Sequence, residues 1–383
     1  MPKNLVVCCD GTGNQIEENL SNVLKLFRIV EKNAQQRVYY EPGIGTLGLN
    51  SAWAKFRANL SGVFGLLTGS GLDGNILSCY RFLCEHYESG DQIYLFGFSR
   101  GAYAMRALAG FINMAGLLWP DQLNLAGAAL QAYKDAGNGA DMMQVWRFQR
   151  ITSSRSATIH FLGAWDTVAS VLVPWRGWLG LPGLQTLPYT RTNPSVRTFR
   201  HAIALDERRR MFRLNRWTAQ QLFKAGRDAA PVPQDCLEVL FAGVHADVGG
   251  GYPEAESAIS KFPLRWMIAQ AEAHGLLISE QRRQHMVEGI QPAVSKTVYV
   301  PPNAAASIHD SMNPGWACLE IIPKRVKYKE WPVRRSLLGF YLPLSEPRQF
   351  SEISNAHESV RDRIEKHGIA RPPNLPEPVN WVS

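Results

Sequence analysis

Short apolar runs of strand length alternate along the chain with segments in which apolar residues recur at helical spacing. The apolar runs occupy residues 4–9, 38–40, 93–96, 158–162 and 237–242, of which the last two contain His160 and Glu238, and each is followed within three residues by a glycine. Helical spacing is found in residues 20–30, 76–87 and 102–115, and again around 123–148. Uninterrupted apolar runs are typical of strands that are covered on both faces. The alternation therefore predicts an α/β fold, with a mostly parallel sheet between two layers of helices.

The alternation is interrupted at about residues 171–220, where prolines and tryptophans break any regular period. We interpret this stretch as a cap inserted into a catalytic domain of residues 1–295. Residues 296–383 show little periodicity apart from a short helix expected near 356–366. We expect them to form a peripheral C-terminal segment packed on the same domain.

The composition is that of a globular protein. With 383 residues, 45% of them hydrophobic, the chain can bury one large core. The longest apolar candidate, residues 107–119, is shorter than the roughly 18 residues that a membrane-spanning helix needs. The N-terminus has no secretory signal of the usual kind, and Cys8 and Cys9 are neighbours in a predicted buried strand, which suits reduced thiols. We expect a cytoplasmic location, or export by a route that uses no signal peptide.

The formal net charge of +8 includes a cluster of eight arginines between residues 191 and 216. Such a cluster is either the solvated face of a helix or a patch that attracts anionic groups. The helix face is the simpler interpretation, and we expect no nucleic-acid partner. A peripheral contact with an anionic membrane surface stays open.

Ser99 lies in the sequence Gly97-Phe98-Ser99-Arg100-Gly101, between an apolar run and a segment of helical spacing. This G-x-S-x-G pattern is weak by itself. Its place between a strand and a helix, however, is that of a nucleophile elbow, a sharp turn that exposes the serine hydroxyl at the carboxyl end of a strand. The glycines permit the turn and a close approach of the helix to neighbouring backbone. The sequence thus predicts that Ser99 is the nucleophile of a serine hydrolase.

A serine nucleophile needs a base within hydrogen-bond reach and an acid that orients the base. Behind a nucleophile elbow these follow in the chain order serine, aspartate, histidine. Asp166 follows the run at 158–162 and His245 follows the run at 237–242, so both fit in order and placement. The other candidates fit less directly, and they are Asp247 for the acid and His201, His309 and His357 for the base.

The oxyanion hole of such an enzyme needs two N–H donors that face the developing negative charge. One donor should be the backbone N–H of Arg100, directly after the nucleophile. The second is expected from the turn after the first strand, where Gly11 and Thr12 are the candidates. An ordinary strand-to-helix turn would have the same sequence pattern.

Trp175, Trp178 and Leu179 lie among prolines in the predicted cap. Such residues either contact a lipid or other ester substrate or pack the cap on the main domain. We predict that they bind substrate. The histidines and carboxylates lack the close spacing of a metal site, and we expect neither a metal nor a cofactor.

Several motifs together carry a family resemblance: Cys9-Asp10-Gly11-Thr12-Gly13-Asn14, Gly97-Phe98-Ser99-Arg100-Gly101-Ala102, Trp165-Asp166-Thr167-Val168, the segment from His201 to Arg209, and the segment from His245 to Tyr252. The chain resembles the α/β-hydrolase family that contains the Tle-type phospholipase effectors of type VI secretion. The resemblance implies an α/β-hydrolase fold and a serine esterase that acts on phospholipids, with Ser99, Asp166 and His245 at the catalytic positions. It also implies an immunity or secretion protein as a partner.

Three other functions fit parts of the sequence. Residues 69–74 match the G-x-G-x-x-G pattern of dinucleotide-binding proteins, but the next strand does not end in the acidic residue that would bind the ribose. The turn at residues 8–12 is similar to that of aspartate-nucleophile phosphatases, but Cys8 stands where the nucleophilic aspartate would be. A catalytically degenerate hydrolase fold that binds a partner stays the alternative to an enzyme.

Overall fold

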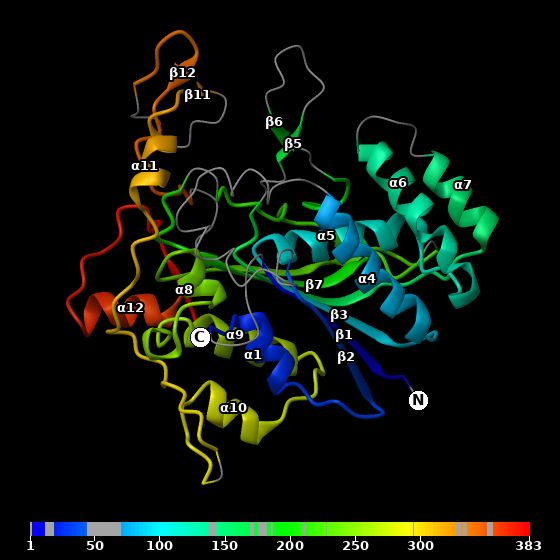
Figure 1. Ribbon diagram of the computed structural model, residues 1–383, viewed down its shortest axis with the longest axis horizontal. Coiled ribbons are helices and arrows are strands. Elements are labelled where there is room, and N and C mark those ends of the chain that lie inside the picture. Colours follow the sequence, from blue (N-terminus) through cyan, green and yellow to red (C-terminus); the bar gives the residue numbers. More distant parts are fainter. Residues whose placement is uncertain are drawn as a thin grey trace.

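A parallel β-sheet of eight strands forms the centre of the molecule (Figure 1). Its strand order is β14-β13-β10-β7-β4-β3-β1-β2, and every neighbouring pair is parallel. The α/β fold with a parallel sheet is therefore confirmed. The computed structural model describes residues 2–11, 19–43, 70–137, 143–168, 172–174, 182–184, 187–209, 212–226, 228–293, 295–326, 331, 335–350 and 355–383.

The elements of the described residues have the following bounds. The central strands are β1 (Asn4–Cys9), β2 (Gln36–Glu41), β3 (Gln92–Phe98), β4 (Ile159–Trp165), β7 (Val196–Ala204), β10 (Asp235–Phe241), β13 (Asn355–His357) and β14 (Asn380–Val382). Three antiparallel pairs lie outside the sheet: β5 (Leu172–Pro174) with β6 (Pro182–Leu184), β8 (Leu222–Phe223) with β9 (Val232–Pro233), and β11 (Lys324–Arg325) with β12 (Phe340–Tyr341). The helices are α1 (Asn22–Ile29), α4 (Ser70–His86), α5 (Arg100–Ala115), α6 (Ala126–Gly137), α7 (Met143–Thr152), α8 (His245–Gly249), α9 (Lys261–Glu272), α10 (Glu280–Met286), α11 (Pro314–Glu320) and α12 (Glu358–Glu365), with short 3-10 turns at Pro120–Leu125 and Glu254–Glu256.

Helices cover both faces of the sheet (Figure 1). Helices α4 to α7 share one apolar core with the strands, and α1, α9 and α10 share the other. Strand β1 shows why the apolar run is continuous, because Leu5, Val7 and Cys9 face the first core while Val6 and Cys8 face the second. Among the described helices, none combines the length and apolar character needed to cross a membrane.

Strand β7 corrects two expectations. Residues 196–204 lie in the middle of the sheet, between β4 and β10, so they are not part of a cap over 171–220. The arginine cluster is not a helix face either, since Arg200 is on β7, is 5% exposed and makes two hydrogen bonds to the carboxylate of Asp235, of 2.8 and 2.9 Å. Arg197 and Arg200 interrupt the apolar run of β7, so a search for such runs does not find this strand.

The C-terminal segment is part of the sheet rather than peripheral to it. Strands β13 and β14 extend the sheet beyond β10, and α12 lies where a short helix was expected. Ala356 and Val360 pack with Leu240 of β10 and with Phe350 in a third apolar cluster. The segment therefore shares the fold of the residues before it.

A pair of glycine substitutions tests this packing. A Cβ at Gly163 of β4 would lie 2.7 Å from both the Phe96 ring and the Met267 sulfur, whereas a Cβ at Gly74 in α4 meets nothing within 4 Å. We expect Gly163→Ala to lower the free energy of unfolding by about 1–3 kcal/mol through overpacking. Gly74→Ala, the same change on an open helix surface, should raise it by about 0.5–1 kcal/mol. Denaturant titration of both variants measures the difference, and equal effects would contradict this view of the core.

Candidate active site

The carboxyl ends of the parallel strands bring the predicted catalytic residues to one edge of the sheet. The carboxyl ends of strands β1, β3 and β4 are aligned, because Cys9 pairs with Gly97 and Gly97 pairs with Ala164. Ser99 follows β3, Asp166 follows β4, and His245 follows β10 as the first residue of α8. Open α/β sheets bind their ligands at this edge.

Ser99 occupies a strained turn between β3 and α5. Its φ of 58° and ψ of −120° lie outside the regions that non-glycine residues favour. The turn needs both flanking glycines, because a Cβ at Gly97 would lie 2.6 Å from the Ala102 backbone and one at Gly101 would lie 2.2 Å from the Cys9 carbonyl oxygen. This is the backbone of a nucleophile elbow.

Asp166 is fully buried and its carboxylate accepts four hydrogen bonds. His245 Nδ1 donates to Oδ2 at 2.5 Å, and the Arg348 guanidinium donates to both oxygens, at 2.6 Å to Oδ1 and 3.0 Å to Oδ2. The Ala204 N–H donates to Oδ1 at 3.0 Å. Burial alone would raise the pKa of Asp166, but the charge of Arg348, together with His245, outweighs it and holds that pKa well below its ordinary value. Asp166 is therefore an ionised carboxylate that orients His245.

The His245 imidazole is held by Asp166 on one side and by aromatic rings on its faces. A carboxylate only accepts, so the neutral ring carries its proton on Nδ1 and leaves Nε2 unprotonated. The ring centroid lies 4.6 Å from that of Phe98 and 4.8 Å from that of Phe212. Burial lowers the pKa of His245 below the ordinary 6.5, although the Asp166 carboxylate acts in the opposite direction. Burial therefore favours the uncharged form of the His245 imidazole.

The predicted nucleophile and base, Ser99 and His245, are linked through the residue that precedes Ser99. Phe98, which precedes Ser99, packs against the His245 ring, yet no hydrogen bond joins the Ser99 hydroxyl to His245 among the described residues. In enzymes without substrate, contacts of this kind are often long and close only on binding. The structure therefore joins two of the three predicted residues directly, and the third is the chain neighbour of Phe98, which contacts His245.

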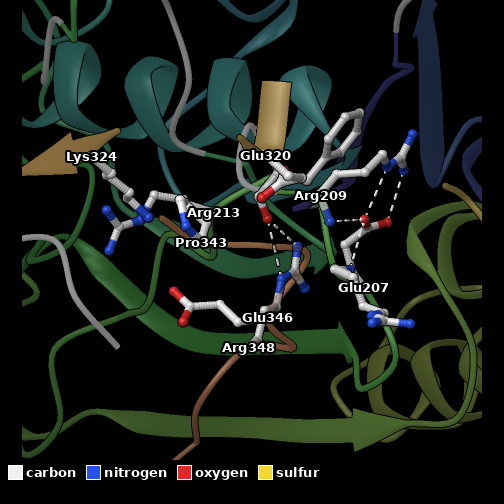
Figure 2. Close-up of a pocket in the computed structure, with 10 residues that line it drawn as sticks. Glu207, Arg209, Arg213, Glu320, Lys324, Pro343, Glu346 and Arg348 are labelled. Atoms are coloured by element: carbon white, nitrogen blue, oxygen red, sulfur yellow. Dashed lines mark hydrogen bonds and ion pairs between the residues drawn. The ribbon is translucent and has the colours of Figure 1, made fainter. Parts of the chain in front are cut away.

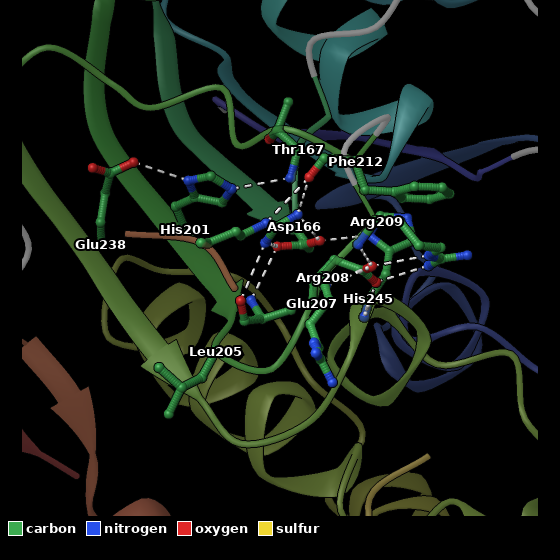
Figure 3. Close-up of polar contacts among 12 residues, drawn as sticks. Asp166, Thr167, His201, Leu205, Glu207, Arg208, Arg209, Phe212, Glu238 and His245 are labelled. Atoms are coloured by element: carbon green, nitrogen blue, oxygen red, sulfur yellow. Dashed lines mark hydrogen bonds and ion pairs between the residues drawn. The ribbon is translucent and has the colours of Figure 1, made fainter. Parts of the chain in front are cut away.

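A buried ion pair supports the backbone of His245. The His245 N–H donates to Glu207 Oε2 at 3.2 Å, and Arg209 donates to both Glu207 oxygens at 2.8 and 2.9 Å. Burial would raise the pKa of Glu207, but Arg209 outweighs it and lowers that pKa to about 2. The Arg209 guanidinium also lies 3.6 Å from the ring centroid of Phe212, which packs against His245 (Figure 3).

His201, an alternative candidate for the base, contacts the loop that carries Asp166. The Thr167 N–H donates to His201 Nε2 at 3.0 Å, and His201 Nδ1 lies 2.9 Å from Glu238 Oε1. Figure 3 shows this chain of contacts on the side of Asp166 away from His245. Because Thr167 directly follows Asp166, the buried His201 fixes the backbone from which the carboxylate projects.

The other candidate residues serve elsewhere. His309 Nδ1 lies 2.6 Å from Asp247 Oδ1, and Asp247 also accepts from the Val244 N–H at 3.0 Å. His357 lies 2.8 Å from the Ser359 hydroxyl at the start of α12. Of the histidines in the described ranges, His245 is the one paired with Asp166.

The turn after β1 lies against the nucleophile, where a second oxyanion donor is predicted. A Cβ at Gly11 would be 3.3 Å from the Ser99 Cβ, so the two residues are adjacent. In this structure the Gly11 N–H donates to Asp10 Oδ1 at 2.7 Å. Arg100 is the first residue of α5, as the predicted first donor requires. The other predicted site residues, Thr12, Trp175, Trp178 and Leu179, lie outside the described residues.

A charged pocket adjoins the acid and the base (Figure 2). Figure 2 shows Lys324 and Arg213 on one side of it and Arg209 and Glu207 on the other. Its lining comes from two distant parts of the chain and consists of Glu207, Arg208, Arg209, Phe212, Arg213, Glu320, Lys324, Pro343, Glu346 and Arg348. Nowhere in the described ranges are three or more histidine, cysteine or carboxylate side chains arranged to hold a metal ion.

Sequence reasoning missed Arg348 and the role of Glu207. Glu207 falls inside one of the motifs that carry the family resemblance, so the sequence offers a signal for it. Arg348 is 182 residues from Asp166 and lies in no motif, so only the folded structure brings it to the site.

Comparisons with known proteins place these residues in a family. A family described as the catalytic domain of the Tle1-like phospholipase effectors of type VI secretion (T6SS) matches residues 3–270. The uncharacterized protein YEL023C of Saccharomyces cerevisiae is 33% identical over 226 residues, which are 55% of this chain and 32% of that protein. The chain thus spans about a third of the length of this relative.

Two solved structures are similar at low identity. One is an uncharacterized protein from Pseudomonas aeruginosa, with a TM-score of 0.39, 19% identity, and coverage of 72% of this chain and 46% of that one. The other is the Tle1 effector bound to the VgrG spike of the type VI secretion system, with a TM-score of 0.33, 18% identity, and coverage of 68% and 53%. The family match extends over Ser99, Asp166 and His245 and over more than half of the chain. The chain belongs to the family of Tle1-like phospholipase effector catalytic domains.

Proposed function

We propose that the chain is a serine esterase that hydrolyses the carboxylic ester bonds of phospholipids through Ser99, His245 and Asp166. The observation that carries the proposal is the buried Asp166–His245 pair, with an Nδ1–Oδ2 distance of 2.5 Å, beside a serine in a strained elbow. The family of phospholipase effectors supports the choice of substrate.

The first half of the reaction forms an acyl-enzyme. Ser99 Oγ attacks the ester carbonyl carbon while His245 Nε2 takes the hydroxyl proton, and Asp166 stabilises the imidazolium that results. The carbonyl oxygen becomes an oxyanion, for which the Arg100 N–H and an amide of Gly11 or Thr12 are the proposed donors. The C–O bond to the alcohol then breaks, and His245 returns the proton to the leaving oxygen.

The second half releases the acyl group. Water replaces the alcohol, His245 Nε2 removes its proton, and the hydroxide attacks the acyl carbon of the Ser99 ester. Collapse of the second tetrahedral intermediate gives a fatty acid and restores the Ser99 hydroxyl. For a phospholipid, the alcohol released first is a lysophospholipid, so the reaction is of the phospholipase A type.

The remaining interactions are proposals that rest on the sequence and the family. We assign contact with the acyl chain to Trp175, Trp178 and Leu179 of the cap. The Tle1 effector is bound to the VgrG spike in its solved structure, and a secretion or immunity protein is the corresponding partner proposed for this chain. We propose a cytoplasmic location, or export by a route that uses no signal peptide.

A binding module with a degenerate hydrolase fold is the second candidate. The following substitution separates the two candidates.

Replacing the nucleophile should abolish hydrolysis and leave the fold intact. We expect Ser99→Ala to lower kcat/KM for a water-soluble short-chain ester by about 10⁴-fold or more. It should also prevent labelling by a fluorophosphonate probe. Ser89→Ala, in an exposed turn, is the matched control and should change neither readout. A folded wild type that neither hydrolyses esters nor takes the label would support the binding module.

The acid limb of the pH profile should report His245. Because the pKa of His245 is below 6.5, the neutral base persists under mildly acidic conditions. We expect kcat/KM for the soluble ester to fall only as the pH drops below 6.5, with the midpoint at the lowered pKa. A midpoint above 6.5 would mean that Asp166 outweighs burial at this histidine.

Removing Arg348 should impair catalysis through Asp166. Arg348→Met leaves the carboxylate held by fewer donors, and a misplaced acid–base pair should lower kcat by about 10²-fold. The loss of a cation beside the pair should also move the acid limb to higher pH, which a purely structural role would not do. Arg348→Lys keeps the charge but not the two-pronged geometry, so it should lower kcat less and leave the limb in place. Thermal unfolding of both variants controls for loss of fold.

A further inference from the structure

A buried arginine lies on the helix that follows the predicted nucleophile. Arg106 is on α5, about two helical turns beyond Ser99, and has no exposure to solvent. Its guanidinium carbon lies 4.9 Å from the ring centroid of Phe199 and 5.5 Å from that of Trp217. Burial lowers the pKa of Arg106 to about 10, which leaves the side chain a cation at neutral pH. The reaction proposed above does not use this group, so its presence needs another explanation.

The stability of the fold does not supply that explanation. Arg106 Nη1 donates to the Asn215 carbonyl oxygen at 2.5 Å, but Nε and Nη2 have no hydrogen-bond partner among the residues that the structure describes. A buried cation and buried N–H groups without acceptors both cost free energy. An apolar side chain of similar length would avoid that cost, but it could not make the hydrogen bond to Asn215.

Asn215 belongs to a segment, residues 212–217, that holds the loop of the predicted acid. The Asn215 N–H donates to the Thr167 carbonyl oxygen at 3.1 Å, and Thr167 directly follows Asp166. The Thr167 N–H donates in turn to His201 Nε2 at 3.0 Å. Both backbone groups of Thr167 are therefore fixed, the N–H by strand β7 and the carbonyl by segment 212–217.

The same segment also contacts the predicted base. The ring centroid of Phe212 lies 4.8 Å from that of His245. The Phe212 carbonyl oxygen accepts a hydrogen bond of 3.1 Å from Arg348 Nε, and Arg348 donates to both oxygens of Asp166. A displacement of segment 212–217 would thus disturb the imidazole and the carboxylate together.

Two charged side chains fix segment 212–217 to the fold. At its end, the Trp217 N–H donates to Glu238 Oε1 at 3.1 Å, and the Trp217 ring stacks on Phe199 with 4.3 Å between centroids. Glu238 is on β10, the strand that precedes the base, whereas Arg106 is on α5, the helix that follows the nucleophile. Of these two anchors, Arg106 is the one that connects the segment to the helix of Ser99.

We propose that Arg106 is a positioning residue, which holds segment 212–217 on α5 and thereby sets the places of Asp166 and His245 relative to Ser99. The inference rests on the proposed function and deepens it, because it names a further residue on which the same site depends. A misplacement of catalytic groups by about 1 Å can lower a rate by about 10²-fold.

The first test replaces Arg106 by an apolar side chain. We expect Arg106→Met to lower kcat for a soluble short-chain ester by about 10- to 100-fold and to change KM by less than about threefold. Its Tm should be unchanged or higher, because the buried cation is gone. Arg106→Lys keeps the charge but not the planar guanidinium, so it should restore only part of kcat. Arg81→Met, at an exposed position of α4, is the matched control and should change none of these values.

The second test measures hydrogen exchange, which needs no hydrolysis. In Arg106→Met, the amides of residues 165–168 and 212–217 should exchange about tenfold faster or more, while those of β1 keep the parent rate. A kcat or an exchange rate that Arg106→Met leaves unchanged would overturn the proposal. A kcat that falls only in step with Tm would also overturn it, by assigning Arg106 to the stability of the fold. If the parent hydrolyses no ester, the proposed function fails, and exchange alone decides whether Arg106 positions the segment.

Discussion

A negative charge without access to solvent is the constraint around which the site is built. The Asp166 carboxylate is fully buried, and an isolated ion in such a place would cost several kcal/mol. It is stable because Arg348 donates to both oxygens and His245 and Ala204 supply further hydrogen bonds. These donors come from three different parts of the chain, so the ends of the strands and the C-terminal segment must converge before the charge is satisfied.

The contacts of the buried Asp166 carboxylate show that the candidate site extends beyond the matched family region. That region ends at residue 270, whereas Arg348 and the pocket residues Glu320, Lys324 and Glu346 lie beyond it. Strands β13 and β14 from this later part also complete the sheet. A fragment confined to the matched residues would leave Asp166 buried without its main counter-charge. The C-terminal residues therefore contribute to the candidate site as well as to the fold.

The sequence predicts the parts of the fold that local patterns specify. Runs rich in apolar residues identify β1, β3, β4 and β10. Both faces are buried along β1 and along most of β3 and β4, whereas β10 is fully buried only over its last three residues. Strand β7 is not predicted, because residues such as Arg200 interrupt its apolar run. The sequence does not show that Asp235 pairs with Arg200 in the folded protein. The strands β13 and β14 are too short to form a pattern. In the site, Asp166 and His245 follow from strand ends, while Arg348 depends on a contact between residues 182 positions apart.

The late position of Arg348 in the chain also sets an order of events during synthesis. A ribosome makes Ser99, Asp166 and His245 well before it makes Arg348, and domains acquire their structure as the chain emerges. Until Arg348 has emerged and packed, the acid is a buried anion without its counter-ion, which disfavours the assembled site. A nascent chain that already carries Ser99, Asp166 and His245 consequently lacks the counter-charge of its buried carboxylate until Arg348 has been made.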